Sequence, residues 1–208
     1  MAREGKDASY AWYVVGVLTL CYVLSFVDRQ ILSLLVGPIK RDLRITDTRV
    51  GVLQGLAFAI FYTLAGLPIG RLVDTRNRRN LVMAGVAVWS VFTSACSAAG
   101  TFWSLFLARI GVGVGEATLN PSAFSLISDY FPRERLNTAL SVYYVGVLVG
   151  SGLALTAGGT IVDAATRAGA IHLPLLGETA AWRLTFLAVG APGLLFAAQA
   201  TKPYTHAD

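Results

Sequence analysis

The sequence predicts an all-α polytopic membrane protein with six transmembrane helices, and three observations lead to that fold class. Apolar residues make up 55% of the 208 residues and charged residues only 14%, which leaves too little polar surface for an ordinary soluble domain. Apolar runs of membrane-spanning length recur six times along the chain. These runs lack the alternation of a strand, and lipid offers no partners to open backbone groups, so we expect helices.

Short polar segments separate the six runs. In chain order the runs cover residues 12–36, 50–69, 81–99, 102–127, 139–162 and 184–200. At about 1.5 Å per residue each is long enough to cross a hydrocarbon core of roughly 30 Å, although the last is near the lower limit. The first run is too long for a signal-peptide core and lacks a clear cleavage site, so we expect it to be retained as a helix.

The six helices divide into two similar sets of three. In each set a span interrupted by charged residues comes first, a glycine-bearing span follows, and an uncharged span ends the set. This order predicts two inverted three-helix repeats. Small residues recur at four-residue intervals on the second and fifth helices: Gly51, Gly55 and Ala59, then Gly146, Gly150, Ala154 and Gly158. Such stripes predict close packing between helices.

Basic residues between the spans predict the orientation of the chain. With the N-terminus inside, the cytoplasmic segments hold nine: Arg3, Lys6, Arg71, Arg76, Arg78, Arg79, Arg133, Arg135 and Lys202. The outer segments hold six: Lys40, Arg41, Arg44, Arg49, Arg167 and Arg183. This bias favours a cytoplasmic N-terminus in the plasma (inner) membrane. The excess positive charge fits this sorting, or contact with anionic lipids, better than nucleic acid, because no aromatic residues interleave a basic patch.

The chain contains little that predicts an enzyme, a cofactor or a metal site. Cys21 and Cys96 both fall inside predicted spans and are expected to pack as small apolar residues. His172 and His206 lack Cys or His partners at metal-ligand spacing, so no metal site is predicted. We also find no H-E-x-x-H motif and no Ser-His arrangement of a hydrolase. A channel stays open as an alternative, because pore-lining groups are hard to recognise in one sequence.

Four charged residues inside the predicted spans are the main functional candidates. Asp28 and Arg29 lie in the first span, and Arg109 and Glu116 share one face of the fourth. A charge in hydrocarbon costs at least roughly 2.5 kcal/mol, so these groups must face protein or water. Measured from opposite helix entries, Asp28 lies roughly 24 Å and Arg109 roughly 10 Å along its helix, which places them at similar depth. They are therefore expected to pair across a central cavity. The alternative is a fixed cluster that only specifies packing.

The segment after the second span, residues 70–79, resembles the signature loop of the major facilitator superfamily. Gly70, Asp74, Arg78 and Arg79 match that pattern, whereas Asn77 stands where the family usually has glycine. We interpret it as a conformational loop in which Gly70 permits a tight helix exit. Asp74 and Arg78 would pair with each other or contact a helix terminus of the opposite half. An ordinary positively charged inner loop is the alternative.

Further motifs resemble spinster-type transporters over nearly the whole chain. They are Phe26-Val27-Asp28-Arg29, Trp89-Ser90, the segment 108–117, Pro121, Asp129-Tyr130-Phe131-Pro132 and Trp182-Arg183-Leu184-Thr185-Phe186. The resemblance implies a carrier of twelve helices in two bundles, and, in eukaryotic members, export of lysolipid or sphingolipid. It would assign Asp28 to proton-linked switching and place Arg29, Arg109 and Glu116 in the lining of the cavity.

The combined hypothesis is a secondary transporter that uses proton-linked alternating access, with Asp28 and Glu116 as the proton-coupling residues. Arg29 and Arg109 would meet an amphipathic, lipid-like or organic-anion substrate. Aromatic residues would supply apolar walls: Phe58, Phe61, Tyr62 and Tyr143. A second six-helix bundle is absent from these 208 residues. The chain is therefore expected to be a piece of a longer carrier, or a half-carrier that forms a homodimer.

Overall fold

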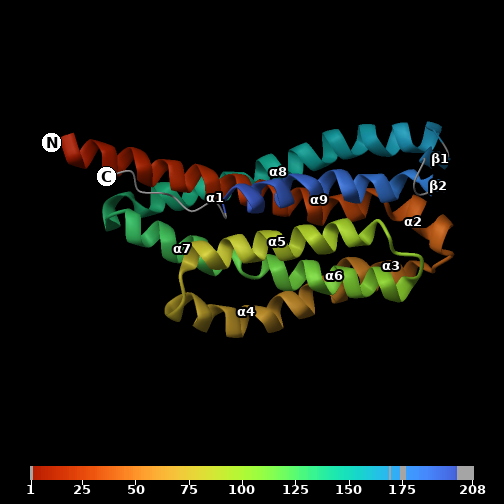
Figure 1. The fold of residues 1–208 in the computed structure, drawn as a ribbon, viewed down its shortest axis with the longest axis horizontal. Coiled ribbons are helices and arrows are strands. Elements are labelled where there is room, and N and C mark those ends of the chain that lie inside the picture. The colour runs from red at the N-terminus through yellow and green to blue at the C-terminus, as the bar shows by residue number, and fades with distance from the viewer. Residues whose placement is uncertain (1, 169, 174–176, 201–208) are drawn as a thin grey trace.

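The computed structural model describes residues 2–168, 170–173 and 177–200, and Figure 1 shows their arrangement. The elements in chain order are α1 (Ala2–Leu34), α2 (Val36–Leu43), α3 (Asp47–Gly51), the π-helix η1 (Val52–Leu56), α4 (Ala57–Thr75), α5 (Arg78–Cys96), α6 (Phe102–Glu116), α7 (Leu119–Tyr130), α8 (Arg133–Ala168), β1 (Ala170–Leu173), β2 (Gly177–Ala180) and α9 (Ala181–Ala200). Nearly all of this is helical, so the predicted fold class is confirmed.

Each predicted apolar run falls on one helix or on two or three consecutive helical elements. Within the described residues, five helical stretches are long and apolar enough to cross a membrane: 8–34, 47–75, 78–96, 102–130 and 133–160. The sixth, α9, has a shorter apolar stretch, Trp182–Leu195. The strands β1 and β2 form a small antiparallel hairpin between α8 and α9, which the sequence did not predict.

Two of the long stretches are not regular α-helices. The second contains the π-helical turn η1 between α3 and α4. The fourth, predicted as one helix, is broken after Glu116, and α7 starts again at Leu119. At the break the Thr118 hydroxyl donates to the carbonyl of Gly115 at 2.9 Å, which satisfies one of the carbonyls that the helix end leaves open. Irregular backbone at membrane depth is tolerated only where protein or a cavity surrounds it, so the break marks an inward-facing position.

The helices pack in pairs that reflect the predicted repeat. The main contacts join α1 with α8, α5 with α9, α5 with α6, and α4 with α6. The repeat relates α1 to α6, α4 to α8, and α5 to α9. Under this exchange the α1–α8 pair becomes the α6–α4 pair, and the α5–α9 pair is unchanged. Two inverted three-helix repeats require this exchange symmetry. In Figure 1, α8 and α4 lie at opposite edges of the bundle.

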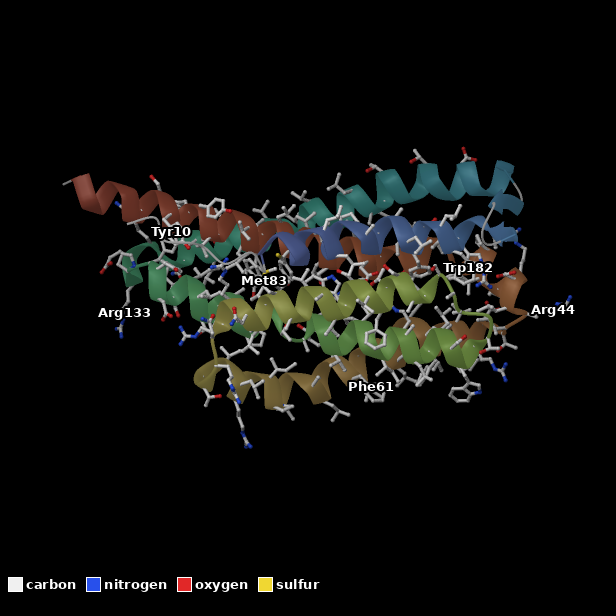
Figure 2. All side chains as sticks on the ribbon, viewed as in Figure 1. Tyr10, Arg44, Phe61, Met83, Arg133 and Trp182 are labelled. Carbon is white, nitrogen blue, oxygen red and sulfur yellow. The ribbon has the colours of Figure 1, made fainter. Side chains whose placement is uncertain are left out.

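The bundle is elongated and has two distinct ends. The start of α1, the α4–α5 turn and the α7–α8 turn lie at one end, here called the N-terminal end (Figure 1). The opposite, hairpin end carries α2, α3, the α5–α6 turn and the two strands. Figure 2 shows Tyr10 and Arg133 near the N-terminal end and Arg44 and Trp182 near the hairpin end. The basic loops that the sequence assigned to one side of the membrane thus lie at one end of the bundle.

The glycine stripe on the fifth span packs as predicted, and the stripe on the second does not. A Cβ added at Gly150 of α8 would lie 2.8 Å from the Cβ of Phe26 on α1, and Gly146 approaches the Thr19 carbonyl in the same way. By contrast, nothing lies within 4 Å of a Cβ placed at Gly51 or Gly55. Within the described residues, α3 and η1 are therefore open at these two positions.

Candidate functional site

The core consists of two apolar clusters with a polar layer between them. On α1 the first cluster ends at Tyr22 and the second begins at Ile31. Ser25 and Asp28 are buried between these two positions. The same happens on α6, where Arg109 lies between the two clusters and is 2% exposed. Charged groups are therefore held in the middle of the bundle, where apolar packing closes off both directions along the helices.

Two ion pairs cross this layer between α1 and α6. Arg29 Nε donates to Glu116 Oε2 at 2.6 Å, and Arg109 Nη1 lies 3.8 Å from Asp28 Oδ2. Ser25, one turn before Arg29, donates its hydroxyl to the same Glu116 oxygen at 2.6 Å. The predicted pairing of Asp28 with Arg109 is therefore present. The four charged residues form one cluster in which each helix supplies one acid and one base.

The two pairs differ in geometry. The Arg29–Glu116 contact is a charge-assisted hydrogen bond, whereas 3.8 Å between Arg109 and Asp28 is too long for one. Asp28 Oδ2 instead accepts from the Thr93 hydroxyl of α5 at 2.9 Å. Among the residues that the structure describes, four buried atoms of the cluster have no hydrogen-bond partner: Asp28 Oδ1, Arg109 Nε, Arg109 Nη1 and Glu116 Oε1. Such unmet capacity is costly, which favours a site that exchanges partners over a rigid packing element.

Aromatic rings surround the guanidinium group of Arg29. Its central carbon lies 4.7 Å from the ring centre of Phe58 and 5.1 Å from those of Phe26 and Tyr62. The Arg29 side chain is 24% exposed, whereas that of Glu116 is fully buried. Arg29 is thus the member of the cluster that reaches the surface, on the side where α4 presents its aromatic residues. A cation held over aromatic faces suits an amphipathic anion, because charge and apolar surface lie side by side.

A polar chain extends from this aromatic group toward α8. Asn120 of α7 donates to the Tyr62 hydroxyl at 3.1 Å and accepts from the Tyr143 hydroxyl at 2.7 Å. Tyr143 is fully buried and stacks on Tyr22 at 4.6 Å. Tyr143 therefore packs inside the bundle behind the site, and does not line the exposed side where Arg29 lies. Figure 2 shows Phe61 on α4 at the edge of the bundle.

Three residues of the site were not singled out from the sequence: Ser25, Thr93 and Asn120. Ser25 carries a recoverable signal, because it precedes Arg29 by four residues on the same helix, and side chains at that spacing share a helix face. Asn120 does not, because the break after Glu116 separates it from α6. Thr93 carries no such signal, since a single hydroxyl in an apolar span is common. Its approach to Asp28 depends on how α5 packs beside α1.

The loop at residues 70–79 differs from its expected geometry. Gly70 does not end the helix, because α4 continues to Thr75. Asn77 is the N-cap of α5 and its side chain accepts from Asn80 N at 3.3 Å, with a φ of −65° that needs no glycine. Of the two contacts expected for Arg78, the pair with Asp74 is not formed; Arg78 pairs with Asp129 at the end of α7. The described part of the chain gives Asp74, which is exposed, no ion-pair partner.

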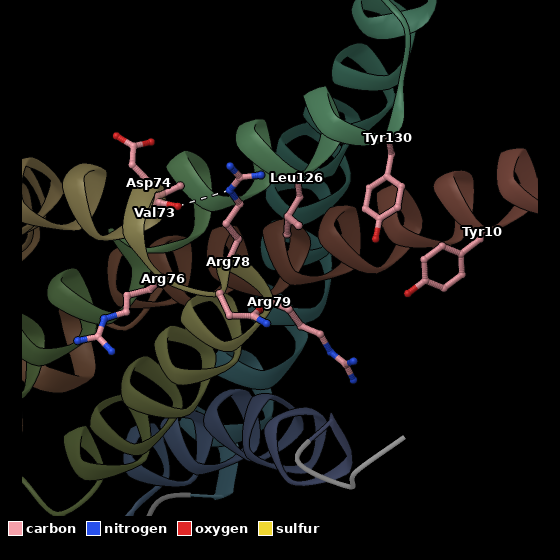
Figure 3. Close-up of a pocket in the computed structure, with 9 residues that line it drawn as sticks. Tyr10, Val73, Asp74, Arg76, Arg78, Arg79, Leu126 and Tyr130 are labelled. Atoms are coloured by element: carbon pink, nitrogen blue, oxygen red, sulfur yellow. Dashed lines mark hydrogen bonds between the residues drawn. The ribbon is translucent and has the colours of Figure 1, made fainter. Parts of the chain in front are cut away.

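Arg78 therefore ties the α4–α5 turn to the other half of the bundle. Its Nε also donates to the Val73 carbonyl at the end of α4, at 3.4 Å, as the dashed line in Figure 3 shows. Three helix ends are joined in this way. Arg79, the next residue, belongs to the wall of a hollow beside the turn (Figure 3).

A second polar latch holds the hairpin end together. Asp42, in the last turn of the short helix α2, accepts from Trp182 Nε1 and from Arg183 Nη2, both at 3.0 Å. Arg183 also donates to the Ser97 carbonyl at the end of α5. The Trp182-Arg183 motif of the sequence thus fixes the start of α9 against two other elements. Among the residues that the structure describes, no group of three His, Cys, Asp or Glu side chains is placed to hold a metal ion.

A bundle of apolar helices around a central charge cluster defines an integral membrane protein of the transporter class. The chain belongs to the Major Facilitator Superfamily, whose sequence profile matches residues 18–204. Its relatives place it among transporters of the spinster type, and hence not among enzymes. The predicted family and class are therefore confirmed.

The relatives include bacterial and animal transporters. An MFS-type efflux pump of Mycolicibacterium smegmatis is 33% identical over 90% of this chain and 40% of its own length. Protein spinster homolog 1 of Bos taurus is 34% identical over 77% of this chain and 31% of its own. A sphingosine-1-phosphate transporter of Xenopus tropicalis is 31% identical over 79% of this chain and 32% of its own. The chain thus spans two-fifths or less of these relatives.

Solved structures show the same fold. A bacterial homologue of the human lysosomal transporter Spinster, crystallised in an inward-facing and occupied conformation, has a TM-score of 0.83 and 36% identity. It matches 92% of this chain and 43% of its own chain. The inward-facing and unoccupied form gives a TM-score of 0.81 at 35% identity.

Proposed function

We propose that this chain is the N-terminal bundle of a proton-coupled secondary transporter that moves an amphipathic, lipid-like or organic-anion substrate by alternating access. The observation that carries this proposal is the cluster of Asp28, Arg29, Arg109 and Glu116. All four groups lie on the two helices that begin the two repeats, and three of them are 2% exposed or less. A purely architectural role is disfavoured, because four buried atoms of the cluster make no hydrogen bond to any described residue.

The switch would operate through the weaker of the two pairs. With Asp28 ionised, its charge attracts Arg109 across 3.8 Å. When Asp28 takes up a proton this attraction is lost, and Arg109 is free to meet Glu116 Oε1 or an anionic substrate group. Glu116, the second proton-coupling candidate, would then exchange between two arginines. Each protonation state favours a different arrangement of α1 and α6, which is the differential stabilisation that alternating access requires.

The substrate class follows from the side of the cluster that is open. Arg29 presents a cation framed by Phe58 and Tyr62, which combines a site for an anionic group with apolar walls. A relative of this chain is named as a sphingosine-1-phosphate transporter, and that substrate combines an anion with an apolar tail. The aromatic lining therefore favours an amphiphile over a small hydrophilic ion.

An open face on α3 and η1 supports the proposal that a second bundle completes the carrier. A Cβ added at Gly51 or Gly55 would meet no described atom within 4 Å, although the spacing of these glycines suits close helix contact. A C-terminal bundle of the same polypeptide is the proposed occupant, and a second copy of the chain is the alternative. We further propose that the N-terminal end of the bundle faces the cytoplasm of a plasma (inner) membrane, because basic residues gather in its loops.

Proton-driven flux in liposomes tests this function. In the full-length protein, Asp28→Asn should abolish the stimulation of lysolipid flux by a pH gradient, with a loss of at least about tenfold for a catalysed proton step. The matched control is Asp47→Asn, which removes an 85% exposed carboxylate at the hairpin end and should leave the stimulation intact. Undiminished proton dependence in correctly folded Asp28→Asn protein would eliminate the proposed switch.

A further inference from the structure

The Thr93 side chain turns away from its own helix toward the central charge cluster. Thr93 is 1% exposed, and its hydroxyl donates from α5 to Asp28 Oδ2 on α1 at 2.9 Å. The hydroxyls of Thr19 and Thr156 instead donate to the carbonyl four residues earlier on their own helices, which is a common bond for a threonine inside a helix. The Thr93 hydroxyl therefore serves the charge cluster and not α5.

The Thr93 hydroxyl competes with Arg109 for the Asp28 carboxylate. Both groups approach Asp28 Oδ2, but Thr93 lies within hydrogen-bond distance, whereas Arg109 Nη1 is 3.8 Å away. A guanidinium and a carboxylate that are free to approach close to about 2.7–2.9 Å. Arg109 Nη1 makes no hydrogen bond to any described residue. This geometry indicates that Thr93 fixes the rotation of the carboxylate and keeps the ion pair loose.

A hydroxyl suits a carboxyl group that gains and loses a proton, because it is both a donor and an acceptor. With Asp28 ionised, the Thr93 hydroxyl donates, as it does in this structure. With Asp28 protonated, the same hydroxyl can rotate and accept from the new O–H group. Arg109 has donors only, so it can bind the ionised form alone. Thr93 can therefore hold Asp28 before and after proton uptake without changing its own charge.

We propose that Thr93 is a positioning residue of the proton switch, an inference that rests on the proposed function. Its hydroxyl holds the Asp28 carboxyl group in one orientation in both protonation states, so that Arg109 alone changes its partner. The ionisable groups that act on Asp28 come from α6, which supplies Arg109 and Glu116, and from α5, which supplies the Cys96 thiol. Without the hydroxyl the carboxylate would close onto Arg109, and the tighter pair would release the arginine more slowly.

Flux of lysophosphatidylglycerol into liposomes that contain the full-length protein, with and without a pH gradient, tests this role. Thr93→Val replaces the hydroxyl by a methyl group and should reduce the stimulation by the gradient roughly tenfold, which corresponds to the lower end for a hydrogen bond to a charged group. Thr93→Ser keeps the hydroxyl and should retain the stimulation within about threefold. A role in packing alone would give the opposite order, because serine loses a methyl group and valine does not.

A double-mutant cycle of Asp28 and Arg109, made in the Thr93→Val background, gives a measurement that does not depend on transport. SDS titration in mixed micelles measures the energetic coupling between the two groups. Because the pair should close when the hydroxyl is removed, the coupling, expressed as an equilibrium constant, should rise roughly tenfold above that in the unmodified background. An unchanged or smaller coupling would show that Thr93 does not keep the pair loose, and would overturn the inference.

The matched control is Thr156→Val, which removes an exposed hydroxyl bonded to its own helix and should leave both measurements unchanged. A loss in Thr156→Val or Thr93→Ser equal to that in Thr93→Val would overturn the role of the Thr93 hydroxyl. Full stimulation in Thr93→Val, beside a loss in Asp28→Asn, would overturn this role and leave the proposed switch intact. Undiminished stimulation in Asp28→Asn would refute the switch and the role of Thr93 with it.

Discussion

Asp28→Ala is expected to lower the free energy of unfolding by about 3–5 kcal/mol, because it leaves the buried guanidinium of Arg109 without its carboxylate. Arg109 is 2% exposed, and an arginine cannot shed its proton to escape the desolvation cost. Its position 5.7 Å from the ring centre of Phe58 compensates only in part. Reversible SDS titration in mixed micelles would measure the effect.

A double-mutant cycle separates the pair from its surroundings. Arg109→Met alone should cost less than Asp28→Ala, because Asp28 can neutralise itself by taking up a proton and keeps its hydrogen bond from Thr93. In Asp28→Ala/Arg109→Met no buried charge of the pair remains, so much of the lost stability should return. Strictly additive effects of the two single substitutions would contradict an energetic coupling between these groups.

Gly115→Ala is expected to destabilise the bundle by about 1–3 kcal/mol, although alanine is normally the better helix former. A Cβ at this position would lie 2.6 Å from the backbone nitrogen of Trp89 and 3.0 Å from the Gly85 carbonyl. Both neighbours are backbone atoms of α5, so α5 and α6 must move apart. Because Glu116 follows directly, the displacement should also weaken its contact with Arg29 and slow transport.

The control for this substitution is Gly152→Ala on α8. Nothing lies within 4 Å of a Cβ at Gly152, so its higher helix propensity should leave stability unchanged or raise it by up to about 1 kcal/mol. The same SDS titration compares the two variants. If both alanine variants changed the free energy of unfolding by the same amount, the close contact between α5 and α6 at Gly115 would not explain the loss of stability.

The candidate site was partly predictable, because charged side chains are rare in membrane spans owing to their free-energy cost in hydrocarbon. A charge inside an apolar span is so expensive that it stands out in any sequence, which is why the four charged residues were found without coordinates. Helix rise alone placed Asp28 and Arg109 at similar depth, and the structure pairs them. The pairing of Arg29 with Glu116 was not predicted, because it depends on how α1 and α6 are rotated about their axes.

The loop beside α4 shows where the sequence misled. Glycine and aspartate suggested a helix exit at Gly70 and a local pair between Asp74 and Arg78. In the fold, α4 continues to Thr75, and the carboxylate that meets Arg78 comes from Asp129, 51 residues away along the chain. Local propensity can be outweighed by a long-range charge pair, and such a pair cannot be read from the spacing of one loop.

The amino-acid sequence was sufficient to predict a helical membrane protein with charged residues in the middle of its bundle. It could do so because hydrocarbon imposes one rule on every residue, that backbone groups be bonded internally and side chains be apolar. Three features became known only from the packed helices: which acid meets which base, the break of α6 after Glu116, and the packing of one glycine stripe but not the other. Those features depend on the relative rotation and approach of helices far apart in the chain, which hydropathy does not encode.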